Sequence, residues 1–463
     1  MQLTKDSLKT SLVHMGREIY RVLVDPSFKL RTIPYVRQTA TEIGVDKDGA
    51  PSGGVKWKAE IFERPWVENL PEDDELNQAI EDTINVVSQR YNLKRTEAEL
   101  EVREFKSWIA KKAISIKFKP SVVDEGAQIF IQDLDNSPVS GNVKVFLLGV
   151  TPRRSLVRIG SNLLIRKVSK DDLTFEHDLF DSSFQKPRIP HSIAEINMEV
   201  SNRKYLPEHQ FAAERLVSFL RLFRAWPVYL TSYSIIFPTI SPSWSISDPC
   251  VPLLGIKRNI IEPEDENRLE RLYQVLSPML RKDIVYRSGK DPISIAYKLY
   301  STALTSEEGN DWKLATTVAG LDALLITDEV GLKRNLARRA GKLLELLGED
   351  PKQVVDKVTA SYDVRSKVFH GDELEEQHII TIRDNLSNMF EYLRKTILFL
   401  LILNTIEGLS KKSIIDYIDN SCIGVTKEGT EMLMEKLRST EIKLGHSYEQ
   451  LGLKGEYSPF SFE

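Results

Sequence analysis

The chain of 463 residues has little cysteine, no excess of positive charge and no long apolar run. Its two cysteines, Cys250 and Cys422, lie far apart and have no metal-ligand spacing, which favours a reduced, cytoplasmic compartment. The 63 basic and 67 acidic residues leave a net charge of -4, so the chain as a whole has no general attraction for nucleic acid. Any contact with RNA therefore requires a local basic patch.

The sequence also lacks segments that would span a membrane or bind a nucleotide cofactor. The first residues have no apolar signal-peptide core, and the longest strongly apolar run, residues 397–403, is too short to span a bilayer. That run predicts a buried helix face instead. The sequence has no Walker-type phosphate loop and no dinucleotide fingerprint, which argues against an NTPase or a dehydrogenase. We expect no membrane partner, no cofactor and no metal.

What is present is the composition of a globular protein, with 41% hydrophobic and 28% charged residues. Hydrophobic spacing predicts a mostly α-helical α+β multidomain chain. Residues 1–120 form an N-terminal helical region of unknown role, with a loop rich in turn residues at 44–54. Residues 121–260 form a β-rich mixed domain, a candidate sensor, with strands at 143–150, 156–159, 163–168, 193–200 and 229–237 and a helix at 207–226. Residues 261–410 form an antiparallel helical bundle, and 411–463 a helical tail.

The most specific stretch is at residues 362–371, YDVRSKVFHG, at the end of a predicted helix. Arg365 shares a helical stripe with apolar residues, so its guanidinium is expected to be buried and to need a partner or a ligand. His370 is rotated from it by roughly 140° and occupies the last turn, before Gly371. An arginine holds phosphate as a permanent cation, and a histidine transfers protons near neutral pH. The two together have the chemistry to cleave RNA without a metal.

Two neighbouring predicted helices carry related features. Asp322 lies on an apolar stripe and therefore requires a cation, which Arg365 or Arg338 could supply. The following helix carries a run of basic residues with no acid between them, and this run is the best candidate for an RNA-binding surface. Its members are Lys333, Arg334, Arg338, Arg339 and Lys342.

Less specific readings of the same residues stay open. An arginine and a histidine at this spacing occur often by chance, and Arg203 and His209 form a similar pair that we interpret as structural or exposed, because Pro207 lies between them. Asp322 has the alternative reading of an ordinary buried ion-pair member. The basic run has the alternative reading of a solvated helix face.

Residues from about 265 to 410 resemble an Apea-like HEPN domain (higher eukaryotes and prokaryotes nucleotide-binding). Residues 321–325, LDALL, resemble the family's LE-x-LL helix, and residues 336–344, LARRAGKLL, resemble its R-x-A-x-LL helix. Residues 362–371 resemble its Y-x-x-RS-x-x-x-HG signature, which is the specific piece. The stretches 148–150 and 159–168 are similar to strands of the β-rich domain that precedes HEPN in such proteins.

The resemblance implies a metal-independent endoribonuclease, often with a toxin or anti-phage role. Arg365 and His370 would be the catalytic pair, with Ser366 beside them and Tyr362 and Asp322 in support. The site would form across a two-fold homodimer, or a higher oligomer, made through the HEPN domain. Asp322 departs from the family's usual glutamate, which puts its role in doubt. Asp372 stands where members modified by AMP transfer carry tyrosine, which argues against that modification.

Three functions are therefore compared. The first is cleavage of RNA by attack of a 2′-hydroxyl on the adjacent phosphate, with His370 as general acid or base and Arg365 stabilising the charge on phosphorus. The second is a non-catalytic HEPN protein that binds RNA or a nucleotide, or simply dimerises. The third is a regulatory protein whose middle domain recognises a phage or host trigger, and it is compatible with the first.

Overall fold

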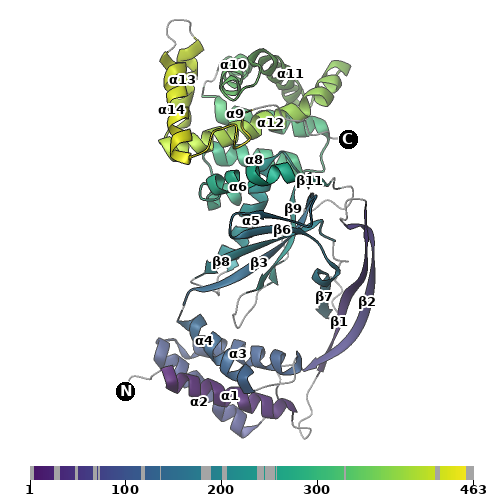
Figure 1. The fold of residues 1–463 in the computed structure, drawn as a ribbon, viewed down its shortest axis with the longest axis vertical. Helices are drawn as coiled ribbons and strands as arrows, with labels where there is room; N and C mark the ends of the chain where they lie inside the picture. Colours follow the sequence, from purple (N-terminus) through teal and green to yellow (C-terminus); the bar gives the residue numbers. More distant parts are fainter. Residues whose placement is uncertain are drawn as a thin grey trace.

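The structure is a computed structural model. It describes residues 5–24, 32–46, 51–65, 70, 73–115, 120–135, 137–178, 189–200, 206–236, 244–245, 256, 258–327, 330–422 and 428–454. These residues form three tiers stacked along the long axis, with N-terminal helices at one end, an antiparallel sheet in the middle and C-terminal helices at the other end (Figure 1). The chain is mostly helical with a β-sheet region, so the predicted α+β class is confirmed.

The N-terminal tier is built from four helices around one apolar core. They are α1 (Lys5–Val24), α2 (Asp74–Tyr91), α3 (Arg95–Ser115) and α4 (Pro120–Leu134). On α1 the apolar residues recur at helical spacing, and Leu8, Leu12 and Met15 are fully buried against the other helices. Because α4 contributes Val123 and Phe130 to this same core, the packing of the tier extends past the predicted end of the first region at 120.

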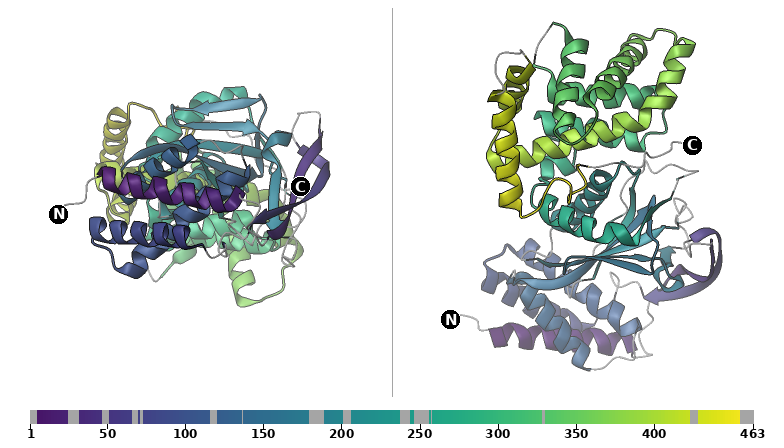
Figure 2. Two further views of the ribbon diagram at one scale, coloured as in Figure 1. Left: turned by 90° about the horizontal axis from the view of Figure 1, so that it is seen from below. Right: turned by 45° about the horizontal axis from the view of Figure 1, so that its top comes forward.

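A long β-hairpin leaves this tier between α1 and α2. Its strands β1 (Thr32–Val45) and β2 (Pro51–Pro65) pair antiparallel, and β1 also pairs with β7 (Thr174–Asp178) from the middle of the chain. Figure 1 and Figure 2 both show the hairpin reaching from the N-terminal helices to the sheet tier. The loop predicted over 44–54 is therefore wrong at both ends, because residues 44–45 and 51–54 continue strands.

The sheet tier has six described strands in the order β10-β9-β3-β8-β6-β5. Their bounds are β3 (Val139–Leu148), β5 (Leu156–Ile159), β6 (Leu163–Lys167), β8 (Ser192–Val200), β9 (Tyr229–Ile236) and β10 (Trp244–Ser245). Beside the sheet, β4 (Val150–Pro152) pairs in parallel with β11 (Asn259–Ile261), and α5 (Leu206–Phe223) packs on β3 and β9. The predicted strands and the predicted helix all correspond to these elements, so this part of the prediction is confirmed.

The helical tier follows β11. Its helices are α6 (Glu266–Leu276), α7 (Lys282–Val285), α8 (Pro292–Thr305), α9 (Asn310–Leu325), α10 (Leu332–Glu345), α11 (Pro351–His370), α12 (Glu376–Glu407), α13 (Lys411–Cys422) and α14 (Glu428–Leu444). The apolar run 397–403 is buried inside α12, as predicted. Within the described part of the chain, no helix is both long and apolar enough to cross a membrane.

One apolar core runs through the sheet tier and the helical tier, and α5 lies between them. Two buried arginines fix that helix. Arg394 of α12 donates to the carbonyls of Leu222 and Phe223 at the end of α5. Arg221 of α5 donates to Val228 O and to Ser301 Oγ of α8. The predicted boundary at 260/261 falls inside this shared core, so the sheet and the C-terminal helices are packed together across it.

Candidate functional site

Helix α11 carries the motif, and its two ends are defined by local chemistry. Asp350 accepts hydrogen bonds from the backbone N–H groups of Lys352 and Gln353, and Pro351 occupies the first turn. Gly371 ends the helix in a left-handed conformation with φ of 75°. The helix therefore stops directly after His370, as the sequence predicts.

Arg365 points from α11 toward α9. Its Nη2 lies 3.2 Å from Asp322 Oδ2, and its Nη1 donates to the Tyr362 hydroxyl at 3.4 Å. The guanidinium also lies over the rings of Tyr362 and Phe369, with its central carbon 5.2 and 5.3 Å from the two ring centres. The Arg365 side chain is 27% exposed. Of the two cations predicted for Asp322, Arg365 is therefore the one that pairs with it. Arg338 binds Asp419 instead.

Asp322 is held in an unfavourable place for a charge. Burial raises its pKa to about 6, and the positive charges of Arg365 and Lys411 oppose part of that rise. Its Oδ1, like Arg365 Nε, is buried with no hydrogen-bond partner among the described residues. Lys411 donates to Ala323 O and Ile326 O at the end of α9. The pair thus keeps unused hydrogen-bonding capacity on both sides.

His370 and Ser366 make no hydrogen bond or ion pair with this cluster among the described residues. His370 is exposed at the end of α11, and in the described part of the chain it makes no hydrogen bond or ion pair. Ser366 is half-buried on the same helix. The structure brings together Arg365, Asp322 and Tyr362, and among the described residues no hydrogen bond or ion pair joins His370 to them.

The basic run on α10 divides into a buried and an accessible part. Arg339 is 2% exposed; it binds Asp419 of α13 at 2.6 Å and donates to Leu325 O. Arg338 is 3.2 Å from the same carboxylate. Arg339 therefore joins α10 to α13 and to the end of α9. Only the other four members of the run remain accessible to RNA.

Those other members have looser partners. Lys333 binds Asp363 at 2.7 Å, and Lys342 binds Glu345 at 3.1 Å, in pairs that are about half exposed. Arg334 is exposed and has no ion pair within the described residues. Exposed ion pairs of this kind contribute roughly 0–1 kcal/mol, so a phosphate could replace the carboxylates.

Sequence reasoning missed the contribution of α13. Lys411 at its start binds the end of α9, and Asp419 near its end binds Arg339 of α10. The tail was predicted without a role. Both contacts join residues about 80 positions apart in sequence. No local sequence pattern predicts such a pairing, so it is seen only in the structure.

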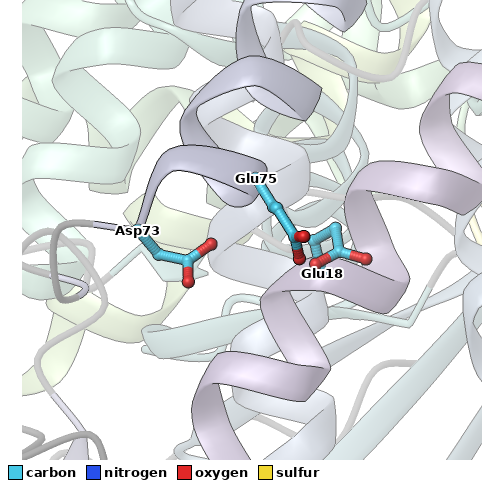
Figure 3. A group of neighbouring side chains, drawn as sticks. All are labelled: Glu18, Asp73 and Glu75. Atoms are coloured by element: carbon cyan, nitrogen blue, oxygen red, sulfur yellow. The ribbon is translucent and has the colours of Figure 1, made fainter.

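Among the described residues, the group of side chains with metal-ligand spacing lies far from α11. Glu18 of α1 and Asp73 and Glu75 at the start of α2 point toward one another in the N-terminal tier (Figure 3). Arg21 binds all three, at 2.6 Å for Glu18 and Asp73 and 3.4 Å for Glu75. One arginine thus bridges the three carboxylates and offsets one of their three negative charges, and we assign no metal to them.

Comparison with known proteins gives no relative: no family model, no curated protein and no solved structure matches the chain.

Asp322 should make the stability of the protein depend on pH. A carboxyl whose pKa is raised on folding stabilises the folded state below its unfolded pKa, and that contribution is lost as pH rises through the folded pKa. We expect wild type to lose about 2 kcal/mol relative to Asp322→Asn between pH 4.5 and 7, which we would measure by urea unfolding. Asp322→Glu keeps a titrating carboxyl and is the control. Parallel wild-type and Asn curves would contradict the assignment.

Proposed function

We propose that the chain is a metal-independent endoribonuclease of the HEPN type, acting in the cytoplasm as a toxin or anti-phage effector. The observation that carries the proposal is Arg365, a half-buried guanidinium held by Asp322 and Tyr362 on the same helix that ends in the exposed His370. The resemblance of residues 265–410 to HEPN sequences supports the same reading.

The proposed reaction uses only groups of the protein and the RNA. The 2′-oxygen of one nucleotide attacks the adjacent phosphorus, and the bond from phosphorus to the 5′-oxygen breaks. A base accepts the 2′-hydroxyl proton, an acid protonates the leaving 5′-oxygen, and His370 serves as one of these. The products are a 2′,3′-cyclic phosphate and a 5′-hydroxyl. Arg365 stabilises the additional negative charge on the phosphoryl oxygens.

Arg365 retains donors for this task in its present position. Its Nη2 lies 3.2 Å from Asp322 Oδ2, and the side chain is 27% exposed, so part of the guanidinium remains accessible. The flanking Tyr362 and Phe369 rings restrict the guanidinium, so its orientation is set before RNA binds. Asp322 is then a positioning residue: it directs the guanidinium and does not need to touch the substrate.

A second copy of the chain would complete the site. One histidine alone does not supply both an acid and a base, and His370 is exposed. Beside it, Phe369 is 49% exposed and Ile379 of α12 is 59% exposed, which gives this end of the bundle an apolar surface. We propose a two-fold homodimer through these helices, with two Arg365/His370 pairs in one cleft.

Two other activities fit particular observations. A HEPN protein that binds RNA or a nucleotide without cleaving it fits the lack of an orienting partner for His370 among the described residues. A sensing role of the sheet tier, for a phage or host component, fits the arginines that join α5 to the helical tier. This sensing role is compatible with the ribonuclease and would control its activity.

Replacement of the proposed acid or base should remove activity. We expect His370→Ala to lower RNA cleavage about 10²–10⁴-fold, because proton transfer by a positioned side chain contributes about that much. The measurement is a gel of total RNA from cells that express either protein, with circular dichroism to show that both fold. His14→Ala, at an exposed position on α1, is the matched control and should cleave normally. Full activity in folded His370→Ala would exclude the catalytic assignment.

Mixing of subunits tests the shared site. Neither Arg365→Ala nor His370→Ala should be active alone, but co-expression should give partial activity. Every heterodimer carries one Arg365 and one His370 from different subunits in the shared cleft, so charge stabilisation and one of the two proton transfers remain. The readout is cleavage by heterodimers purified through two different tags. A monomer with full specific activity at nanomolar concentration would contradict the dimeric site.

A further inference from the structure

A groove of about 1060 Å³ lies between α10 and α11, next to the motif. The two helices are adjacent in Figure 1, and their contacts show an antiparallel register. Lys333 near the start of α10 meets Asp363 near the end of α11, whereas Gly341 lies against Pro351 and Val355 at the start of α11. A Cβ on Gly341 would lie 2.7 Å from a methyl group of Val355, so the helices come closest at that end.

The groove has an apolar floor and a basic rim. The apolar part of its lining, called the floor here, includes Leu332, Ala337 and Val355, of which Ala337 is buried and the other two are half-buried. Its lining carries four cations and one carboxylate. The cations are Lys333, Arg334, Arg338 and Lys342, and the carboxylate is Glu345. An occupant of this groove should therefore combine negative charge along its edge with flat apolar surface below, which is the chemistry of unpaired nucleotides.

Tyr362 links the groove to Arg365. Its side chain lines the groove, and its hydroxyl accepts a hydrogen bond from Arg365 Nη1. A base stacked on this ring would place its own phosphate beside the guanidinium. From Val355 to Arg365, α11 rises about 15 Å, which is enough for up to about four nucleotides at roughly 3.4 Å each.

Duplex RNA fits this groove poorly. In a duplex the bases are stacked inside and only phosphates and sugars face outward, so nothing would cover the apolar floor. An acidic peptide would satisfy the cations but would leave the same floor without flat partners. The length, the floor and the rim all favour a single strand.

We propose that the α10–α11 groove binds the unpaired nucleotides that flank the cleaved bond, so that the substrate is single-stranded RNA. This proposal rests on the proposed ribonuclease function and adds the class of RNA that it acts on. The exposed ion pairs of Lys333 and Lys342 open when phosphates take the place of Asp363 and Glu345.

The test is binding by protein that carries His370→Ala, so that affinity is measured without cleavage. The probe is a fluorescein-labelled single-stranded RNA of ten nucleotides, followed by anisotropy, beside the same sequence as a duplex and a ten-residue polyglutamate. Thr359 lies on the groove lining, half-buried on α11. Thr359→Glu places a carboxylate in the groove, and Thr359→Gln has nearly the same size without the charge. Arg334→Gln removes a rim charge, and Lys352→Gln removes one on α11 outside the lining.

We expect the single strand to bind at least about tenfold more tightly than the duplex or polyglutamate, which corresponds to about 1.4 kcal/mol. Thr359→Glu should weaken this binding about tenfold more than Thr359→Gln, and Arg334→Gln more than Lys352→Gln. Equal affinities within either pair, or preference for the duplex or polyglutamate, would overturn the proposal. So would conversion of a dimer to a monomer by Thr359→Glu in light scattering, because the groove would then be a subunit interface.

The two proposals fail separately in this experiment. If wild type cleaves RNA while Thr359→Glu and Thr359→Gln bind the single strand equally, the groove is excluded and the ribonuclease stands. If the groove variants differ as expected but wild type cleaves no RNA, the ribonuclease is excluded and the groove stands as a binding site.

Discussion

The ion pair between Arg365 and Asp322 is the contact on which the candidate site depends. It joins α11 to α9 at a place where burial raises the pKa of the carboxyl to about 6. A buried pair of this kind is weak evidence for stability, because apolar residues of similar volume often stabilise as well or better. Perturbed carboxyls next to a cation are found more often where chemistry takes place. We therefore interpret the pair as a means of orienting Arg365 toward a phosphate.

The rest of the helical tier supports that orientation. Lys411 and Asp419, both on α13, bind the end of α9 and the middle of α10. Arg394 joins α12 to α5 and so to the sheet. A change in the sheet tier would reach the bundle through this shared core, which gives a physical route for regulation by a bound trigger. That route is a proposal, because contact alone does not demonstrate coupling.

Much of this fold could be predicted from local sequence, and the exceptions share a cause. Asp350 and Gly371 define α11 through its caps. The apolar stripe of α11 predicted a buried Arg365, and the structure leaves that side chain 27% exposed. The hairpin was missed because its glycine- and proline-rich middle resembles a loop, although the flanks alternate as strands do. The burial of Arg339 and the role of Lys411 were missed because Asp419, which binds Arg339, and Ala323, which binds Lys411, lie far away in sequence. Such contacts are fixed by tertiary packing and leave no local pattern.

The central claim is that this chain cleaves RNA with its own side chains. The most direct measurement is the chemistry of the product ends after incubation of purified protein with RNA in EDTA. The account predicts cleavage that survives chelation, with 2′,3′-cyclic phosphate and 5′-hydroxyl ends, because the 2′-oxygen is the nucleophile. Products with 3′-hydroxyl and 5′-phosphate ends, formed only after magnesium is restored, would contradict it.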